Sequence, residues 1–308
     1  MSEVPLAATE APLVRTVSGS CPPSAIDGAV LPREHLRSDM RRAADAGSDP
    51  HRWLDEEQEV VRELCGLRQS DRLGLVVELS CIGMGRDAAT LARVAAGSRV
   101  AVVAGTGFFS GPFTPSWALD ADVDTLTAHL LAEIENGLDG TGVRPGVIGE
   151  IGIWGQEPTP AEERCVAAAA RASLASGLPV ATHHRGGPAL LEILLREGLP
   201  AHRVSVAGTG AEPTTPREIV ERGGYVCLTS LGADRLQQAL DLIEAGYAHR
   251  LLLSSGLSKV SEIERYGGAG YSHLFRIFLP RLRESGISEE TIRLITHDNP
   301  LRWLSFTE

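Results

Sequence analysis

Residues 147–183, VIGEIGIWGQEPTPAEERCVAAAARASLASGLPVATH, contain the pattern that decides the fold. A short apolar run at Val147–Ile151 is followed by a helix-like segment at Pro160–Ser176 and by a second apolar run at Val180–His183. Thr159 supplies a hydroxyl suited to capping a helix that starts at the following proline. A strand, a helix and a strand in this order are typical of a parallel sheet, whose crossovers contain helices.

The same alternation continues along most of the chain. The other strand candidates are Val30–His35, Gly74–Leu79, Val100–Ala104, Arg203–Ala207, Tyr225–Leu228 and Arg250–Ser254. Helix-like segments lie at Asp87–Ala96, Asp124–Asn136, Ala189–Glu197, Pro216–Gly223 and Asp234–Ala245. Eight strands with intervening helices in 308 residues predict an α/β fold, a single-domain (β/α)8 TIM barrel. A doubly wound sheet is the alternative, but the glycine-rich phosphate loop expected after its first strand is absent.

Composition narrows the class of protein. We expect a flexible N-terminal arm at residues 1–15, rich in Ala, Pro and Glu, before a barrel at residues 16–308. The net charge of −11 argues against a nucleic-acid or anionic-membrane surface. An apolar run of about 18 residues, long enough to span a membrane, is absent, as is a secretion signal, so we expect a cytoplasmic protein. The five cysteines form no CxxC pair and suggest neither a zinc knuckle nor a disulfide framework.

The segment Leu31-Pro32-Arg33-Glu34-His35-Leu36 looks like a metal-binding motif with one ligand replaced. His-x-His at the end of a strand places two imidazoles on the same side of the backbone, because side chains repeat every second residue. Here Arg33 stands at the first position and only His35 remains. A guanidinium has no lone pair to donate to a cation. Either the likeness is accidental, or a metalloenzyme scaffold has altered its metal chemistry; the rest of the sequence favours the second interpretation.

Short motifs follow one another along nearly the whole chain: Thr16–Gly19, Leu31–His35, Gly83–Asp87, Gly105–Phe108, Ile148–Gly152, Glu162–Ala172, Thr182–His183, Tyr266–His273, Leu279–Leu282, Gly286–Ile287 and Asn299–Pro300. Their order and spacing resemble the phosphotriesterase-related family of the amidohydrolase superfamily, from about Thr16 to Trp303. The resemblance implies a barrel with two divalent metals, commonly zinc. These activate a bridging hydroxide against esters, lactones or phosphotriesters.

The resemblance also implies a ligand set, which this chain keeps only in part. His35 matches the second histidine of the first strand, Glu150 the acidic ligand of the fourth strand, and His183 the histidine of the fifth. Three ligand positions are lost. They carry Arg33 on the first strand, Gly208 on the sixth and Gly256 on the eighth.

The losses argue against a two-metal reaction. Catalytic zinc usually has three protein ligands and an open position for water, and the missing eighth-strand aspartate also removes a proton acceptor. We therefore predict a small-molecule enzyme without a metal cofactor, with Arg33 pairing with Glu150 or gripping a substrate anion. His35 and His183 would act as general acid and base. Such a site suits elimination, isomerisation, cyclisation or hydrolysis.

Other interpretations stay open. A residual zinc hydrolase of esters or lactones would hold a single zinc ion with His35, Glu150 and His183. A non-catalytic pseudoenzyme would keep the barrel to bind a ligand or partner. Two further interpretations concern the residues themselves: Arg33 turns outward and lies on the rim as a solvated charge, and His35 and His183 are relics that fill the barrel interior with satisfied hydrogen bonds. Members of the family often pair, so the resemblance allows a homodimer, which nothing in the sequence establishes.

Several further residues are candidates for substrate binding because they follow strand candidates: Trp154, His184, Arg185 and Lys259. Lys259 also matches a lysine often seen in the family. The sequence does not decide whether Glu78 and Ser80 face the barrel mouth. Glycine at positions 208 and 256 suggests a pocket enlarged by missing side chains.

Overall fold

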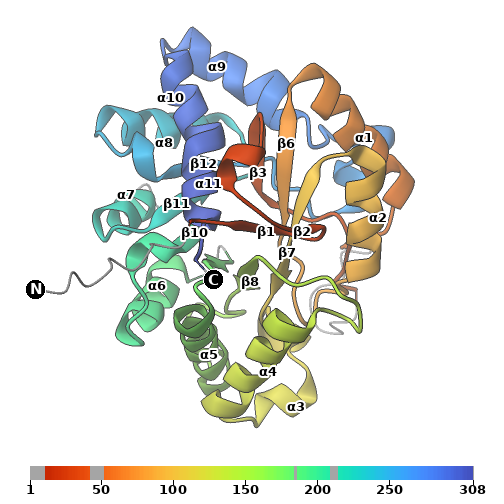
Figure 1. The fold of residues 1–308 in the computed structure, drawn as a ribbon. Helices are drawn as coiled ribbons and strands as arrows, with labels where there is room; N and C mark the ends of the chain where they lie inside the picture. Colours follow the sequence, from red (N-terminus) through yellow and green to blue (C-terminus); the bar gives the residue numbers. More distant parts are fainter. Residues whose placement is uncertain (1–10, 42–51, 184–185, 209–213, 308) are drawn as a thin grey trace, which may run out of the picture.

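The structure is a computed structural model that describes residues 11–41, 52–183, 186–208 and 214–307. Eight strands form one sheet in the order β12-β11-β10-β9-β8-β7-β6-β3, and every neighbouring pair is parallel. The predicted (β/α)8 barrel is confirmed (Figure 1). The strands are β3 (Ala29–Glu34), β6 (Leu73–Glu78), β7 (Ala101–Thr106), β8 (Val147–Ile151), β9 (Val180–Thr182), β10 (Val204–Gly208), β11 (Tyr225–Leu228) and β12 (Leu251–Leu253).

Helices surround the strands. The helices that follow the barrel strands are α1 (Glu57–Ser70), α2 (Ala88–Ser98), α4 (Val123–Asn136), α5 (Pro160–Ser176), α6 (Gly187–Arg196), α7 (Thr214–Glu221) and α8 (Ala233–Glu244). The short helix α3 (Ser116–Leu119) precedes α4, and the C-terminal part adds α9 (Leu279–Glu284), α10 (Glu289–Arg293) and α11 (Asn299–Leu304). Single helical turns, such as η2 (Gly111–Phe113) and η5 (Val260–Glu262), occur in the connecting loops.

The start and end of α5 follow the chemistry of its sequence. The Thr159 side chain accepts a hydrogen bond from the backbone of Glu162, and the Glu162 side chain accepts one from the backbone of Thr159. This reciprocal pair is a capping box, and proline occupies the first helical position. Gly177 ends the helix in the left-handed region, with φ of 76°. The helix predicted at Pro160–Ser176 is therefore confirmed residue for residue.

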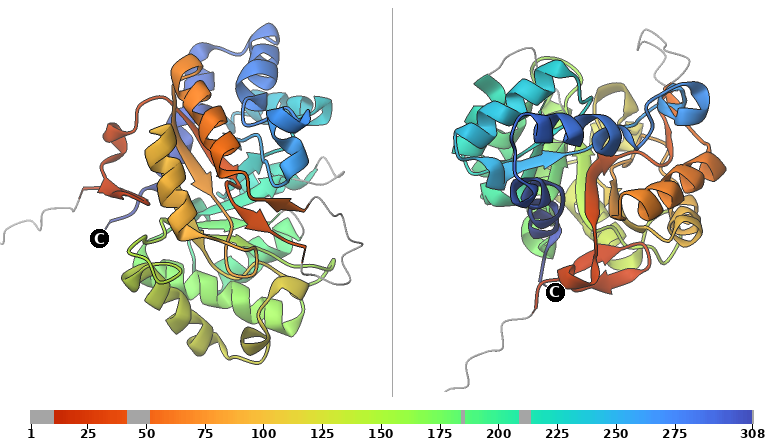
Figure 2. Two further views of the ribbon diagram at one scale, coloured as in Figure 1. Left: turned by 90° about the vertical axis from the view of Figure 1, so that its right-hand side faces the viewer. Right: turned by 90° about the horizontal axis from the view of Figure 1, so that it is seen from above.

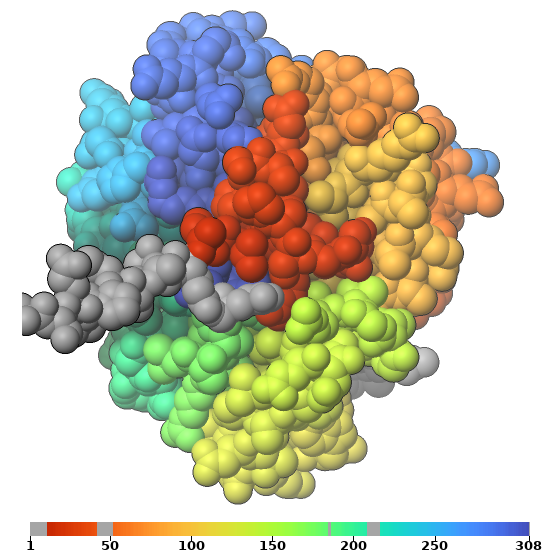
Figure 3. All heavy atoms as spheres, viewed as in Figure 1, coloured from red at the N-terminus to blue at the C-terminus, as the bar shows by residue number. Residues whose placement is uncertain are grey.

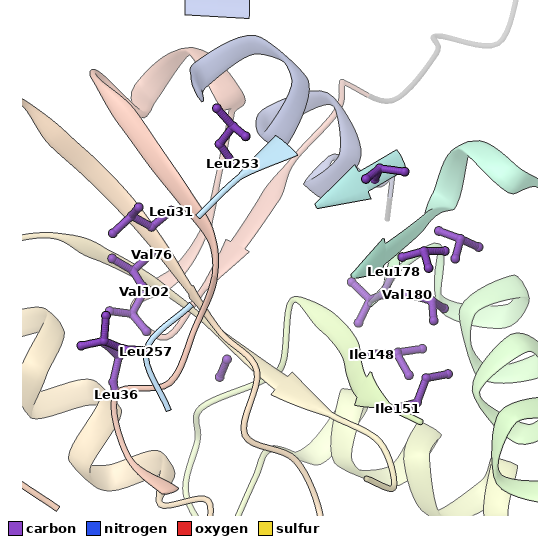
Figure 4. Packing of buried hydrophobic residues seen from close by; sticks show 14 of the residues in the cluster. Leu31, Leu36, Val76, Val102, Ile148, Ile151, Leu178, Val180, Leu253 and Leu257 are labelled. Carbon is purple, nitrogen blue, oxygen red and sulfur yellow. The ribbon is translucent and has the colours of Figure 1, made fainter. Parts of the chain in front are cut away.

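Two hydrophobic layers hold the barrel together. Val76 and Val102 pack with residues of the surrounding helices, such as Leu64, in the layer between strands and helices. Figure 4 shows Leu31, Val76 and Val102 side by side on neighbouring strands. The strand residues between these point the other way and form a second cluster inside the barrel, which includes Leu75 on β6. Side chains that alternate along each strand explain why both layers are apolar.

Two small hairpins lie at opposite ends of the barrel (Figure 2, left). The strands β1 (Val14–Thr16) and β2 (Gly19–Cys21) pair antiparallel near the amino ends of the barrel strands. In Figure 3 this hairpin and the C-terminal segment lie over the middle of that face. The strands β4 (Ser38–Asp39) and β5 (Trp53–Leu54) pair antiparallel beyond the carboxyl end of β3. The β1–β2 hairpin thus covers the middle of the amino end of the barrel.

Residues 1–10 of the predicted N-terminal arm lie outside the described residues. The domain boundary predicted at residue 16 falls within the strand β1. Among the described residues, no helix combines the length and apolar character needed to cross a bilayer.

A buried carboxylate closes the seam between β12 and β3, which share no strand ladder. Glu34, at the end of β3, is fully buried. Its carboxylate accepts hydrogen bonds from the hydroxyl of Ser254 at 2.7 Å and from the backbone N–H groups of Gly256 at 2.9 Å and Leu257 at 2.7 Å. The backbone N–H of His35 donates to the carbonyl of Leu257 at 3.0 Å. The hydrogen bonds of the Glu34 side chain therefore connect β3 to the segment after β12, where a strand ladder is absent. They fix the neighbouring residues Arg33 and His35 in position.

This seam predicts a pH effect on stability. Burial raises the pKa of Glu34 from 4.5 to about 7, although its three hydrogen bonds oppose the shift. Between these two values the folded protein keeps the proton and the unfolded chain loses it, so stability falls as pH rises. The quantity to follow is the difference in the free energy of unfolding between the wild type and Glu34→Gln. We expect this difference to fall by at most about 3 kcal/mol as the pH rises from 4.5 to about 7. Urea denaturation at several pH values measures the difference. The exposed Glu290→Gln is the control, and a difference that does not vary with pH would contradict the prediction.

Candidate active site

The four predicted catalytic residues lie together at the carboxyl ends of the strands. Arg33 lies in β3 and His35 directly after it, Glu150 lies in β8, and His183 follows β9. Glu150 is the centre of the group. Its Oε1 contacts the guanidinium of Arg33 and lies 3.8 Å from Nε2 of His183, and its Oε2 lies 3.2 Å from Nε2 of His35. The structure therefore brings the four side chains together, while their catalytic roles stay predictions.

Arg33 and Glu150 face the barrel interior because the strands are irregular at these points. Leu31 packs in the outer layer, so strict alternation would also turn Arg33 outward. The pairing of β3 with β6 shifts register between Leu31 and Glu34, and that of β8 with β9 shifts between Ile148 and Ile151. Such irregularities re-aim side chains and are frequent next to active sites. Each strand thus presents a charged residue to the interior.

Arg33 forms a buried ion pair. The side chain of Arg33 is 8% exposed and that of Glu150 is 5% exposed. Nη1 of Arg33 also donates to the backbone carbonyl of Thr182 at 2.9 Å, and the Arg33 backbone N–H donates to Ser254. Burial by itself would raise the pKa of Glu150, but the charge of Arg33 and the hydrogen bond and charge of His35 hold it well below its usual value. Glu150 is therefore an ionised carboxylate held by a fixed cation.

His35 lies between two carboxylates. Its Nδ1 is 2.9 Å from the hydroxyl of Ser80, which itself donates to a backbone carbonyl, and 3.7 Å from Oε1 of Glu78. Burial lowers the pKa of His35, but the hydrogen bonds to Glu150 and Glu78 outweigh it and raise the pKa from 6.5 to about 9. At neutral pH His35 is therefore a second cation beside Arg33.

His183 is the most accessible of the four side chains, with 12% exposed compared with 8% for Arg33 and for His35. The ring of Phe109 contacts it edge-on, with ring centroids 5.1 Å apart. A histidine held between a carboxylate and an aromatic ring at the carboxyl ends of the strands is well placed to exchange a proton with a substrate.

The structure describes two of the four predicted substrate-binding residues, Trp154 and Lys259. Trp154 lies in the loop after β8 and packs against aromatic residues of the loop after β7. Lys259 precedes η5, where its backbone N–H donates to Glu262 at 3.0 Å. His184 and Arg185 lie outside the described residues. Their roles in binding stay predictions.

The pocket enlargement predicted at Gly256 is wrong. Gly256 has φ of +78°, and a Cβ atom there would lie 2.6 Å from Cβ of Thr229. The side chain of Thr229 therefore fills the space that a missing side chain would leave. A left-handed backbone and this close neighbour also make an aspartate at position 256 incompatible with the present packing. Gly208 ends β10, and the residues that follow it lie outside the described part of the chain.

Three residues of the site were not predicted. Glu78 and Ser80 were left undecided, and the structure shows both in contact with His35. Glu34 was missed because its hydrogen-bond donors follow β12, far along the chain. One signal was available, since a glutamate in an apolar strand needs hydrogen-bond donors and the loop after β12 supplies them. In the described part of the chain, Oε2 of Glu78 is buried without a hydrogen-bond partner.

A separate cavity of about 390 Å³ opens at the amino ends of β3 and β6. Ala29 and Arg72 line it on the strand side, and Phe275 and Ile292 on the helix side. This cavity lies at the opposite end of the barrel from Glu150 and contains none of the four candidate catalytic residues.

Comparisons with known proteins agree with the fold, and the similar proteins include a hydrolase. A sequence model described as the phosphotriesterase family matches residues 12–304. The phosphotriesterase homology protein of Escherichia coli (strain K12) is 29% identical over 288 residues, covering 89% of this chain and 96% of that protein. The N-acetyltaurine hydrolase of Homo sapiens is 28% identical over 278 residues, covering 82% of this chain and 79% of that protein.

Solved structures show the same architecture. The crystal structure of the E. coli phosphotriesterase homology protein, with phosphate in its active site, has a TM-score of 0.85 at 28% identity. It covers 90% of this chain and 98% of that chain. A resiniferatoxin-binding protein from Rhodobacter sphaeroides has a TM-score of 0.86 at 26% identity, covering 95% and 94% of the two chains. These similarities extend over essentially the whole barrel.

Proposed function

Since the chain belongs to the phosphotriesterase family, we propose that it hydrolyses a small amide or ester at the barrel mouth, with Arg33 in the place of the metal ions typical of that family. The observation that carries the proposal is the buried ion pair of Arg33 with Glu150. A permanent cation already balances the carboxylate that would otherwise bridge two metals. The relatives that hydrolyse N-acetyltaurine favour hydrolysis among the acid/base reactions that the site suits.

The donor set at the mouth does not fit a pair of metal ions. One oxygen of Glu150 contacts Arg33 and the other lies beside His35, and Nδ1 of His35 faces Ser80. Within the described ranges, no group of three or more His, Cys, Asp or Glu side chains is arranged to hold a metal ion. A metal ion at this place would meet repulsion from the guanidinium of Arg33 and from protonated His35. These observations support chemistry carried by the side chains themselves.

In the proposed reaction, His183 removes a proton from a water molecule whose oxygen attacks the carbonyl carbon of the substrate. The carbonyl electron pair moves onto its oxygen, and Arg33 stabilises this oxyanion. A guanidinium has five N–H groups, and the side chain of Arg33 uses two of them in its bonds to Glu150 and Thr182. Glu150 stabilises the positive charge that His183 acquires. When the C–N or C–O bond breaks, His183 returns the proton, and the products are a carboxylic acid and an amine or alcohol.

The test is turnover in the presence of a metal chelator. We would assay a panel of small amides and esters, N-acetyltaurine among them, with protein kept in chelator throughout purification. We expect at least one member of the panel to be hydrolysed, at a rate that neither the chelator nor added zinc changes. Activity that disappears with chelator and returns with zinc would contradict the proposal and favour a residual zinc hydrolase. A panel without any turnover would favour a non-catalytic binding protein.

A further inference from the structure

Aromatic rings extend from the candidate active site toward the rim of the barrel. Phe109 follows β7, Phe113 lies in η2, and Trp154 follows β8; we call these three residues the aromatic wall. Ring centroids are 5.4 Å apart between Phe109 and Phe113, and 5.6 Å apart between Phe113 and Trp154. Because Phe109 also contacts His183, the aromatic wall begins at the proposed general base.

Glu162 fixes the position of the aromatic wall. This glutamate is 3% exposed, and its Oε1 accepts hydrogen bonds from the backbone N–H groups of Gly111 at 3.0 Å and Trp154 at 2.7 Å. Gly111 has φ of +39°, and a Cβ atom there would lie 2.4 Å from Cβ of Trp154. The loops after β7 and β8 are therefore tied to each other and to the start of α5. A wall held this way is preformed for binding.

Arg52 lies over the outer part of the aromatic wall. Its guanidinium carbon is 5.8 Å from the ring centroid of Phe113 and 5.6 Å from that of Trp154. Within the described part of the chain, the side chain of Arg52 has no ion pair or hydrogen bond. Arg41, on the same hairpin, also lies over a tryptophan but is paired with Asp39. Arg52 is thus a partly exposed cation, held in place by aromatic faces, with N–H donors available to a ligand.

We propose that Arg52 and the aromatic wall form a subsite for the part of the substrate that lies away from the reacting bond. The substrate then carries an anionic group, such as a carboxylate, phosphate or sulfonate, for Arg52. An apolar or aromatic body connects that group to the bond that is cleaved. This inference rests on the proposed function only in placing the reacting bond at His183.

The surroundings agree with this division of the substrate. The aromatic wall packs with Met40, Cys81 and Met84 into one apolar cluster. Cys81 and Met84 are buried behind the aromatic wall, so an apolar ligand body meets the aromatic rings, above all the partly exposed Trp154. A guanidinium recognises the planar or tetrahedral oxygens of an anion through two parallel hydrogen bonds. The two kinds of contact come from different side chains and can be tested separately.

The experiment is a binding measurement that needs no turnover, so its failure is distinct from failure of the proposed reaction. The probes are 4-phenylbutyrate and its neutral isostere 4-phenylbutyramide, titrated into the protein while the indole N–H signal of Trp154 is followed by NMR. That signal is assigned with Trp154→Phe. We expect the acid to bind more tightly than the amide. In Arg52→Gln we expect the affinity for the acid to fall about tenfold, as when a bidentate charged hydrogen bond is lost, and that for the amide to stay unchanged.

Two variants make the result specific. Arg52→Lys keeps the charge without the planar fork and should lose less affinity than Arg52→Gln. Arg41→Gln removes the other arginine of the hairpin and should leave binding unchanged. Equal binding of acid and amide by the wild type, no binding of the acid, or unchanged binding of the acid in a folded Arg52→Gln would each overturn the proposal.

Discussion

Replacing Arg33 with methionine is expected to lower the free energy of unfolding by about 4 kcal/mol, because a buried carboxylate loses its cation. Glu150 is almost fully buried, and the two histidines near it lie farther away than the guanidinium. Arg33→Lys keeps the charge, so its free energy of unfolding should fall by less than that of Arg33→Met. It should still fall, because an ammonium cannot bond Glu150 and Thr182 together as the guanidinium does. Urea denaturation of the three proteins measures these differences.

Two controls separate the ion pair from a general effect of losing an arginine. Arg283→Met removes an exposed ion pair with Glu289 and should cost less than about 1 kcal/mol. The double variant Arg33→Met with Glu150→Leu removes both buried charges and should recover most of the stability. If Arg33→Met alone were as stable as the wild type, Arg33 would not be the counter-charge of Glu150.

Replacing His183 with glutamine is expected to reduce kcat by about 10²- to 10⁴-fold, the usual contribution of a general base. Glutamine fills a similar space but neither accepts nor returns a proton at neutral pH. Because His183 is partly exposed and lies 3.8 Å from Glu150, the stability should change little. Steady-state kinetics on the substrate found in the panel, with thermal denaturation beside it, measures both quantities.

The control is His249→Gln, which changes an exposed histidine far along the chain after α8. It should leave kcat and KM unchanged. If His183→Gln kept the activity of the wild type within a few-fold, the base would have to be another group, and the proposed mechanism would be wrong. A loss confined to KM would instead make His183 a binding residue.

The fold was predictable because each of its units has a local cause. The strands predicted at Val147–Ile151 and Tyr225–Leu228 have those bounds in the structure, and the others differ by one or two residues at an end. Apolar runs bounded by glycine and capping residues fix a strand or helix without reference to distant contacts. The helix α1 and the β1–β2 hairpin were not predicted. Short strands and a helix rich in charged residues give weak periodicity.

The four candidate catalytic residues were predictable from the sequence, but their geometry was not. The resemblance to the family identified Arg33, His35, Glu150 and His183, and the structure brings them together. The direction of Arg33 depends on a register shift in β3, which no local pattern encodes. The sequence also does not show that the space beside Gly256 is filled, because Thr229, which fills it, lies in the loop after β11. Contacts between strands distant in sequence decide both features.

The most direct test of the central claim is the zinc content of the purified wild-type protein. The protein would be produced with zinc in the medium, dialysed against buffer without chelator, and analysed by inductively coupled plasma mass spectrometry. We expect far less than one zinc ion per chain, because the guanidinium of Arg33 holds the carboxylate that would bridge the metals. Two zinc ions per chain would contradict it.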